Sequence, residues 1–269
     1  MKKKDSINQV VENNDGLLIR KSSALAKFLP STITISAFCF GLTSIRLALF
    51  YSWELAVLCI FVAAMLDALD GKIARLLGQS SQFGAELDSL SDLVCFGVAP
   101  SVILFLKSVH LLGSAGWGAC MFFSICCGLR LARFNAARLS SEPVPEWAKK
   151  YFSGVPAPAG AAIAMLPLAL FFETGCYMFL NPMFVTCCLL VSGALMISTL
   201  KTFSSKMIEI ANGFTVVALL SISLLIICLI TEIWLTISTL ILIYLLSIPY
   251  GSYKYSKTKE AEESVKKKA

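Results

Sequence analysis

Long apolar runs separated by short polar segments occupy this chain from about residue 30 to residue 250. A transmembrane helix needs about 20 mostly apolar residues, because each residue advances the helix by about 1.5 Å across a hydrocarbon layer of about 30 Å. The pattern therefore predicts an all-α fold, a polytopic membrane helix bundle of about eight transmembrane helices. The expected spans are residues 32–50, 54–77, 88–106, 117–137, 156–173, 179–199, 212–231 and 233–250.

The composition agrees with a membrane protein. Of the 269 residues, 57% are hydrophobic and 15% are charged, and the mean hydropathy is +0.77, whereas about a quarter of the residues are charged in ordinary soluble domains. The ten cysteines lie almost wholly in the apolar runs without a CxxC spacing, so we expect small packing residues and no disulfide framework. His110 stands alone in a short loop, and we expect no metal role for it.

The placement of lysine and arginine predicts the orientation, because cytoplasmic loops carry an excess of both residues. With eight spans and the N-terminus inside, 21 of the 23 basic residues fall on the cytoplasmic side, and only Arg46 and Lys107 fall on the other. We therefore expect an inner or plasma membrane protein with both termini in the cytoplasm. The net charge of +6 then reflects topology and attraction to anionic lipid headgroups, and nothing indicates nucleic acid.

These features divide the chain into four expected segments. Residues 1–27 are polar and lack the apolar region and cleavage site of a signal peptide, so we expect a cytoplasmic tail that includes a short interfacial helix. Residues 28–205 form the core, residues 206–252 supply two additional transmembrane helices, and residues 253–269 form a charged cytoplasmic tail.

Four aspartates interrupt the apolar pattern in the second and third spans. A charged side chain at membrane depth costs at least a few kcal/mol, so such residues face a polar cavity, pair with one another or hold a metal. On the second helix two of them share one face with small residues and an arginine: Asp67, Asp70, Gly71, Ala74 and Arg75. On the third helix the other two share a face with a glycine: Gly84, Asp88 and Asp92.

Two antiparallel helices could bring these four carboxylates to one point. Unpaired, they would repel one another strongly, and divalent cations would remove the repulsion. Ligation by oxygen alone, with no cysteine or histidine nearby, suits Mg²⁺ or Mn²⁺ rather than Zn²⁺. We therefore predict that Asp67, Asp70, Asp88 and Asp92 hold two divalent ions. The alternative is a helix hairpin whose acids reach out to water.

The spacing D-x2-D-G-x2-A-R-x8-G-x3-D-x3-D, from Asp67 to Asp92, resembles the signature of the CDP-alcohol phosphotransferase family at every fixed position. Residues 129–135, L-R-L-A-R-F-N, and residues 154–159, G-V-P-A-P-A, resemble the phosphatidylserine synthase branch of that family. The resemblance covers roughly residues 28–200. It departs at Ser31, where the family usually has asparagine after proline, and this weakens any nucleotide contact at that position.

The resemblance implies an enzyme in which an alcohol, here L-serine, attacks the phosphorus of CDP-diacylglycerol and releases CMP. It also implies that Asp92, last in the motif, is the general base, and that the protein is a homodimer among membrane lipids. The two ions would neutralise the pyrophosphate, and Arg75 would donate to a phosphate. Gly71, Ala74 and Gly84 would let the cytidine of the CDP-lipid approach the backbone closely.

A serine acceptor also needs a partner for its carboxylate. Arg130 and Arg133 share a helix face, and either could form that charge-assisted pair while Asn135 orients the amine. Composition alone favours a different interpretation, in which both arginines belong to the excess of basic residues on the cytoplasmic side.

Two other functions are compatible with the same residues. A sister enzyme would join the donor to glycerol 3-phosphate or an inositol phosphate, and those acceptors would also require arginines near the site. A cation-binding transporter would use the carboxylates as its ion site, although the chain shows no internal repeat of the carboxylate hairpin of the kind that many transporters have.

The predicted topology can be tested by labelling introduced cysteines in a cysteine-depleted variant. We expect a membrane-impermeant thiol reagent to leave Ser140→Cys unmodified in intact cells and to modify it once the cells are opened, because the basic loop 138–152 is expected inside. Ser114→Cys, on the opposite side, should react in intact cells. Modification of Ser140→Cys from outside would contradict the eight-span topology.

Overall fold

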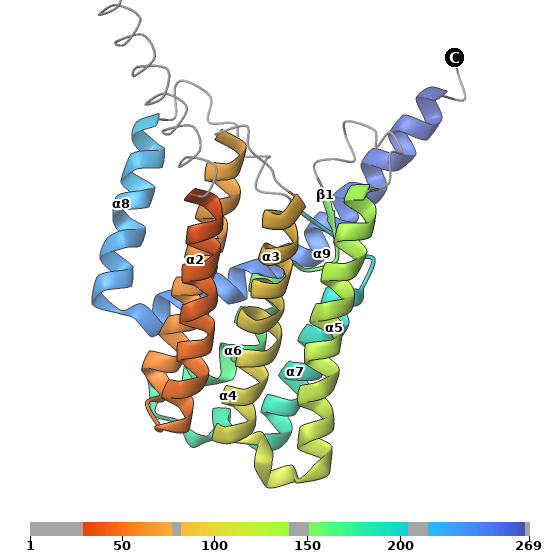
Figure 1. Cartoon of the computed structure of the whole chain (residues 1–269). Coiled ribbons are helices and arrows are strands. Elements are labelled where there is room, and N and C mark those ends of the chain that lie inside the picture. Colours follow the sequence, from red (N-terminus) through yellow and green to blue (C-terminus); the bar gives the residue numbers. More distant parts are fainter. Residues whose placement is uncertain (1–28, 77–81, 140–150, 204–214, 267–269) are drawn as a thin grey trace, which may run out of the picture.

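A computed structural model describes residues 29–76, 82–139, 151–203 and 215–266, which form a bundle of long helices (Figure 1). The long helices are Leu29–Leu49, α2 (Trp53–Leu76), α3 (Gln82–Asp92), α4 (Ala99–Lys107), α5 (Ser114–Leu139), α6 (Ala157–Thr174), α7 (Pro182–Ile197), α8 (Thr215–Thr231) and α9 (Ile233–Lys266). Three short helical segments join them: η1 (Leu93–Val98), η2 (Val109–Leu112) and η4 (Tyr177–Leu180). Two three-residue strands, β1 (Tyr151–Ser153) and β2 (Lys201–Phe203), pair antiparallel.

The prediction of a polytopic helical membrane protein is confirmed. Because α3, η1 and α4 form one continuous helix, each of the eight expected spans coincides with a described helical segment. Among the described residues, five helices are long and apolar enough to cross a membrane: Leu29–Leu49, Gln82–Lys107, Ser114–Ala137, Ala157–Thr174 and Ile233–Gly251. Pro182–Ile197 and Leu219–Thr231 are apolar but shorter.

Two boundaries differ from those of the expected spans by more than one helical turn. The third helix begins at Gln82, six residues before the start of the expected span at 88, so it includes Gly84 of the motif. The last helix continues to Lys266 beyond the expected span, which ends at 250, since its charged end is rich in lysine and glutamate, which favour helix. The predicted tail 1–27, residues 140–150 of the basic loop, and residues 206–211 between the sixth and seventh expected spans lie outside the described residues.

The segment η1 lies in the middle of the core. It is a π-helical turn in which the N–H of Ala99 bonds to the carbonyl of Val94, and it packs against α5, α6 and α2. Small residues allow this close approach. A Cβ added at Gly41 would overlap the Sγ of Cys95, and one added at Gly97 would lie 3.1 Å from the Cβ of Cys127. The backbone of Leu29–Leu49 at Gly41 and the side chain of Cys127 on α5 therefore contact η1 closely.

Buried hydroxyl groups join α4 to α5 just beyond η1. The Oγ of Ser101 lies 2.7 Å from the carbonyl oxygen of Gly97 and 2.9 Å from the Oγ of Ser124, which in turn donates to the same carbonyl at 3.1 Å. In an apolar surrounding such hydrogen bonds satisfy groups that would otherwise be costly to bury, and they also link the helices.

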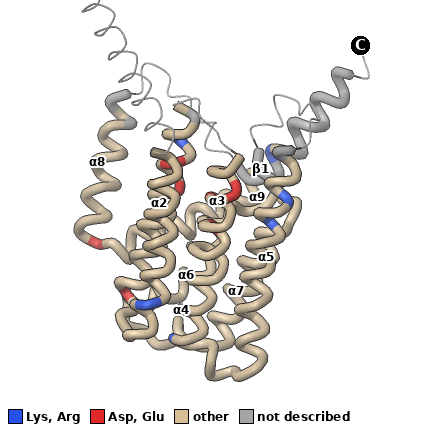
Figure 2. The backbone as a smooth tube through the Cα atoms, viewed as in Figure 1, with Lys and Arg blue, Asp and Glu red and all other residues tan. Residues whose placement is uncertain are grey.

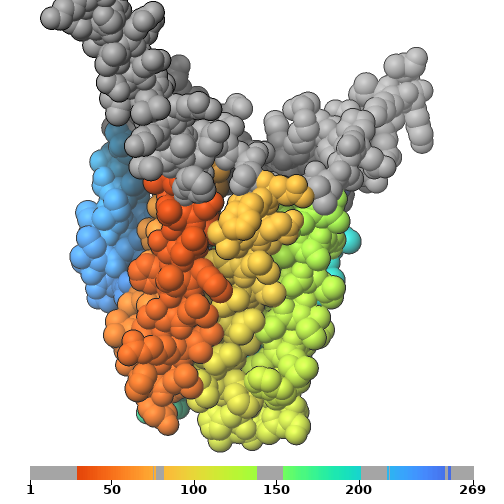
Figure 3. Space-filling view, in the orientation of Figure 1, coloured from red at the N-terminus to blue at the C-terminus, as the bar shows by residue number. Residues whose placement is uncertain are grey.

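The end of α2, the start of α3, the end of α5 and the β1–β2 pair meet at one end of the bundle, the upper end in Figure 1. Figure 2 shows that the acids of α2 and α3 and the arginines of α5 gather at this end. On the face seen in Figure 3, Leu29–Leu49, α3 with α4, and α5 lie side by side, while α8 stands at one edge. α8 packs against α9. The helix bundle thus brings the acids of α2 and α3 and the arginines of α5 together at one end, where a functional site is expected.

Candidate functional site

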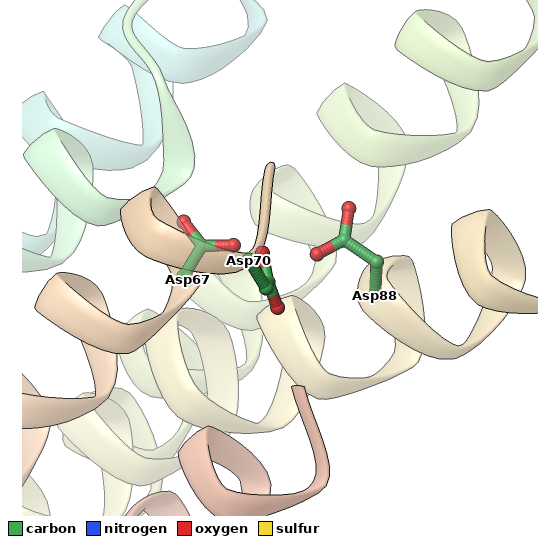
Figure 4. A group of neighbouring side chains, drawn as sticks. All are labelled: Asp67, Asp70 and Asp88. Atoms are coloured by element: carbon green, nitrogen blue, oxygen red, sulfur yellow. The ribbon is translucent and has the colours of Figure 1, made fainter. Parts of the chain in front are cut away.

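Three of the four predicted carboxylates face one another where α2 ends and α3 begins. One oxygen each from Asp67, Asp70 and Asp88 lies within 4.8 Å of the other two. Figure 4 shows the three side chains, two from α2 and one from α3, directed toward a common space. The spacing i, i+3 on α2 places Asp67 and Asp70 on one face of that helix. The antiparallel start of α3 then brings Asp88 opposite them.

Asp92 joins this cluster from the next turn of α3. Asp67 lies beside both Asp88 and Asp92. Asp92 in turn interacts electrostatically with Asp67 and Asp88. Asp92 lies immediately before η1, deeper in the bundle than Asp88. The structure therefore brings together all four aspartates that the sequence predicted to converge.

Arg130 of α5 is a positive side chain beside these acids. It interacts electrostatically with Asp92 and Asp67, and the carbon of its guanidinium lies 5.9 Å from the ring centre of Phe134. A single guanidinium offsets only part of the charge of four carboxylates. Since the donor set is all oxygen and compact, the cluster fits hard divalent cations such as Mg²⁺ or Mn²⁺.

The small residues of the motif leave space next to the carboxylates. Gly71 is exposed, and a Cβ added there would meet no atom within 4 Å beyond its own helix and neighbours. Ala74 and Gly84 are half-buried. Arg75 lies in the last turn of α2, and its side chain is outside what the structure describes. A ligand can therefore approach the backbone of α2 at Gly71.

The structure separates the two arginines that were predicted for the acceptor. The Nη1 of Arg133 donates to the carbonyl of Ile197 at 2.8 Å, and its Nη2 lies 3.4 Å from the carbonyl oxygens of Met196 and Ser198. These carbonyls belong to the last turn of α7, which has no helical N–H to pair with them. Arg133 is therefore held at the C-terminus of α7, whereas Arg130 lies beside the carboxylates.

The backbone corner at Gly154 lies next to both Arg133 and the end of α7, and the absence of a side chain there leaves room for their contact. Gly154 has φ of +80°, and an added Cβ would lie 2.5 Å from the carbonyl oxygen of Met196 and 2.9 Å from the Nη2 of Arg133. Only glycine combines that backbone conformation with that space. The chain then enters α6 through Pro156, which precedes the first helical residue.

Asn135 also contacts the protein rather than open space. Its Nδ2 donates to the Oγ of Ser89 at 2.9 Å and so joins the end of α5 to α3. Ser89 directly follows Asp88. This contact was missed from the sequence, because Ser89 is outside the motif and lies 46 residues away.

Thr34 is a second residue that sequence reasoning missed. Its Oγ1 lies 2.6 Å from the Oδ2 of Asp70, and both residues are 5% exposed. The first span holds other hydroxyl residues, Thr32 and Ser36 among them, so no sequence signal singled out Thr34 as the partner of Asp70. The first described helix therefore also contributes to the site.

Comparison with known proteins places these motifs in a family. The sequence model of the CDP-alcohol phosphatidyltransferase family matches residues 27–202. The chain is 37% identical over 227 residues to the CDP-diacylglycerol–serine O-phosphatidyltransferase of Mycobacterium leprae, covering 84% of this chain and 74% of that protein.

Two further relatives carry the same name. Identity is 41% over 151 residues with the protein from Mycobacterium tuberculosis, which covers 55% of this chain and 52% of that one. It is 39% over 140 residues with the protein from Bacillus subtilis, which covers 52% of this chain and 75% of that one. The chain thus spans about half the length of the M. tuberculosis relative.

We expect Mn²⁺ or Mg²⁺ to raise the melting temperature of the purified protein, because a cation that binds the folded carboxylates stabilises the folded state. At a hundred times the Kd this stabilisation is about 2.7 kcal/mol. Asp88→Asn should lose most of the shift, and Glu86→Gln, an exposed position on the same helix, should keep it. Thermal unfolding in detergent measures both. An undiminished shift in Asp88→Asn would mean that the cation binds elsewhere.

Proposed function

We propose that this chain, which belongs to the CDP-alcohol phosphatidyltransferase family, transfers the phosphatidyl group of CDP-diacylglycerol to L-serine and yields phosphatidylserine and CMP. The observation that carries the proposal is the cluster of four aspartates at one end of a membrane bundle. The shared name of the three relatives supports serine as the acceptor over glycerol 3-phosphate or an inositol phosphate.

The carboxylates would act in two ways. Asp67, Asp70, Asp88 and Asp92 would hold two divalent ions, which supply positive charge to the pyrophosphate and to the leaving phosphate oxygen. Asp92 would also accept the proton of the serine hydroxyl as general base. The serine oxygen then forms a bond to the phosphorus of the phosphatidyl group while the bond from that phosphorus to the CMP oxygen breaks.

The donor would bind on the α2 side of the cluster. Arg75, Gly71, Ala74 and Gly84 come from the two helices that carry the acids. The exposed backbone at Gly71 would let the nucleotide lie close to α2, and the guanidinium of Arg75 would donate to a phosphate. The acyl chains of the donor would remain in the bilayer, and soluble serine would arrive from the aqueous side.

The acceptor pocket would lie on the α5 side of the cluster, and the contacts of the two arginines favour Arg130. Arg130 is next to Asp92 and Asp67, so a carboxylate that it binds would lie near the proposed base. Arg133 already donates to the end of α7, and Asn135 donates to Ser89. In this proposal Arg133 and Asn135 hold the end of α5 in place, and Arg130 alone binds the acceptor.

Orientation and assembly complete the proposal. The site would face the cytoplasm, because the end of the bundle that holds it also holds the arginines of α5 and the ends of the expected cytoplasmic loops. Both termini would lie on that side. Residues 28–205 would form the catalytic core, residues 206–252 two accessory helices, and the protein would work as a homodimer, as the family resemblance implies.

The direct test is release of CMP by purified protein given CDP-diacylglycerol, Mn²⁺ or Mg²⁺, and a panel of acceptors. We expect L-serine to support turnover, and Asp67→Ala, Asp70→Ala, Asp88→Ala and Asp92→Ala each to abolish it, since each removes a ligand or the base. Each variant should still insert and fold, as its recovery in the membrane fraction and a single size-exclusion peak in detergent would show. More than about a tenth of wild-type turnover in Asp88→Ala would rule out the proposed site.

The two arginines should respond differently to substitution by lysine, which keeps the charge but loses the planar fork. Arg130→Lys should raise the KM for serine about ten- to a hundredfold with little change for CDP-diacylglycerol, because a charge-assisted pair contributes about 1.5 to 3 kcal/mol. Arg133→Lys should lower the melting temperature instead. Steady-state kinetics decides, and an unchanged serine KM in Arg130→Lys would place the acceptor pocket elsewhere.

A further inference from the structure

We infer that Thr34 is a positioning residue that holds the carboxylate of Asp70 in its metal-binding orientation, an inference that rests on the proposed metal site. Thr34 lies on the helix Leu29–Leu49, outside the carboxylate motif of α2 and α3. It would act through Asp70 and touch neither substrate nor cation itself.

The contact is short and buried. The Oγ1 of Thr34 donates to the Oδ2 of Asp70 at 2.6 Å, and each residue is 5% exposed. The same Oγ1 lies 3.1 Å from the carbonyl oxygen of Pro30. A hydroxyl has one proton, and a carboxylate is the stronger acceptor, so the proton lies toward Asp70.

Neighbouring hydroxyls on the same helix show that this arrangement is particular to Thr34. Thr32 donates to the carbonyl of Leu29 at 2.8 Å, and Ser36 donates to the carbonyl of Thr32 at 2.9 Å. Both are exposed and bond within their own helix, which is the ordinary behaviour of such residues in apolar helices. The shortest hydrogen bond of Thr34 instead reaches a different helix, 36 residues away.

The packing around Thr34 makes it a fixed donor. One turn deeper, the carbonyl of Ala37 accepts from the Sγ of Cys95 at 3.4 Å. A further turn deeper, Gly41 packs so closely on Cys95 that an added Cβ would overlap the sulfur. These contacts set the position of the helix against η1, and therefore the position of the Thr34 hydroxyl against the end of α2.

Asp70 needs such a partner because the neighbouring carboxylates repel its side chain. Asp70 interacts with the like charges of Asp67 and Asp88, so without a cation other rotamers of Asp70 are favoured. The hydrogen bond from Thr34 opposes that movement. It occupies Oδ2, and the carboxylate retains a second oxygen for a cation. Groups that orient a metal ligand in this way typically contribute about 10- to 100-fold to metal affinity.

The test compares Mn²⁺ binding to purified, full-length wild-type protein and three variants, measured by isothermal titration and by the electron paramagnetic resonance signal of free Mn²⁺. Thr34→Val keeps the shape but removes the hydroxyl, and we expect binding about 10- to 100-fold weaker. Thr34→Ser keeps the hydroxyl and should bind within about threefold of wild type. Thr32→Val, the matched control on the same helix, should bind as wild type does.

The outcomes separate this inference from the proposed function. Wild-type affinity in Thr34→Val would overturn the role of Thr34 while leaving the metal site intact. No Mn²⁺ binding by the wild type, or equal binding by Asp70→Asn, would overturn both. Melting temperatures without metal show whether each variant is folded. If Thr34→Val is not, Thr34→Ala provides the same comparison, with the same loss expected and wild-type affinity again overturning the inference.

Discussion

Mutual repulsion among four aspartates on two neighbouring helices is the constraint on which the rest of this structure depends. Asp67, Asp70, Asp88 and Asp92 lie within reach of one another in a bundle that is otherwise apolar, where charge interactions are weakly screened. Left alone, they would push α2 and α3 apart. Contacts that involve no acid oppose this separation, since η1 and α4, which continue the helix of α3, pack directly against α2.

The C-terminal end of α5 connects three parts of the site through side chains of one helical turn and a half. Arg130 faces the aspartates, Arg133 pairs with the carbonyls that end α7, and Asn135 bonds to Ser89 on α3. Because the three side chains share one helix, α5 contacts the acids, α7 and α3 within the same short stretch. The region around the acids is therefore stabilised by polar contacts as well as by packing.

Much of this organisation could be predicted from the sequence, and the exceptions have physical causes. Apolar runs located the helices, since a bilayer requires a fixed length, and the i, i+3 and i, i+4 spacings located the acids. The pairing of Thr34 with Asp70 was not predictable, because it depends on how helices pack across 36 residues. The contact of Arg133 with the end of α7 was missed for a different reason: the excess of basic residues on the cytoplasmic side is enough to explain an arginine at this helix end.

The π-helical turn η1 sets how the two halves of its helix, α3 and α4, are rotated relative to each other. A π turn accommodates one more residue than an α-helical turn, so the face that follows it is rotated by about 100° relative to an uninterrupted helix. The extra residue lets Asp88 and Asp92 point toward α2 while Ser101, two turns later, meets Ser124 on α5. A deletion of one residue between Leu93 and Val98 would thus misalign the two halves, although it would leave every side chain of the carboxylate motif in the sequence.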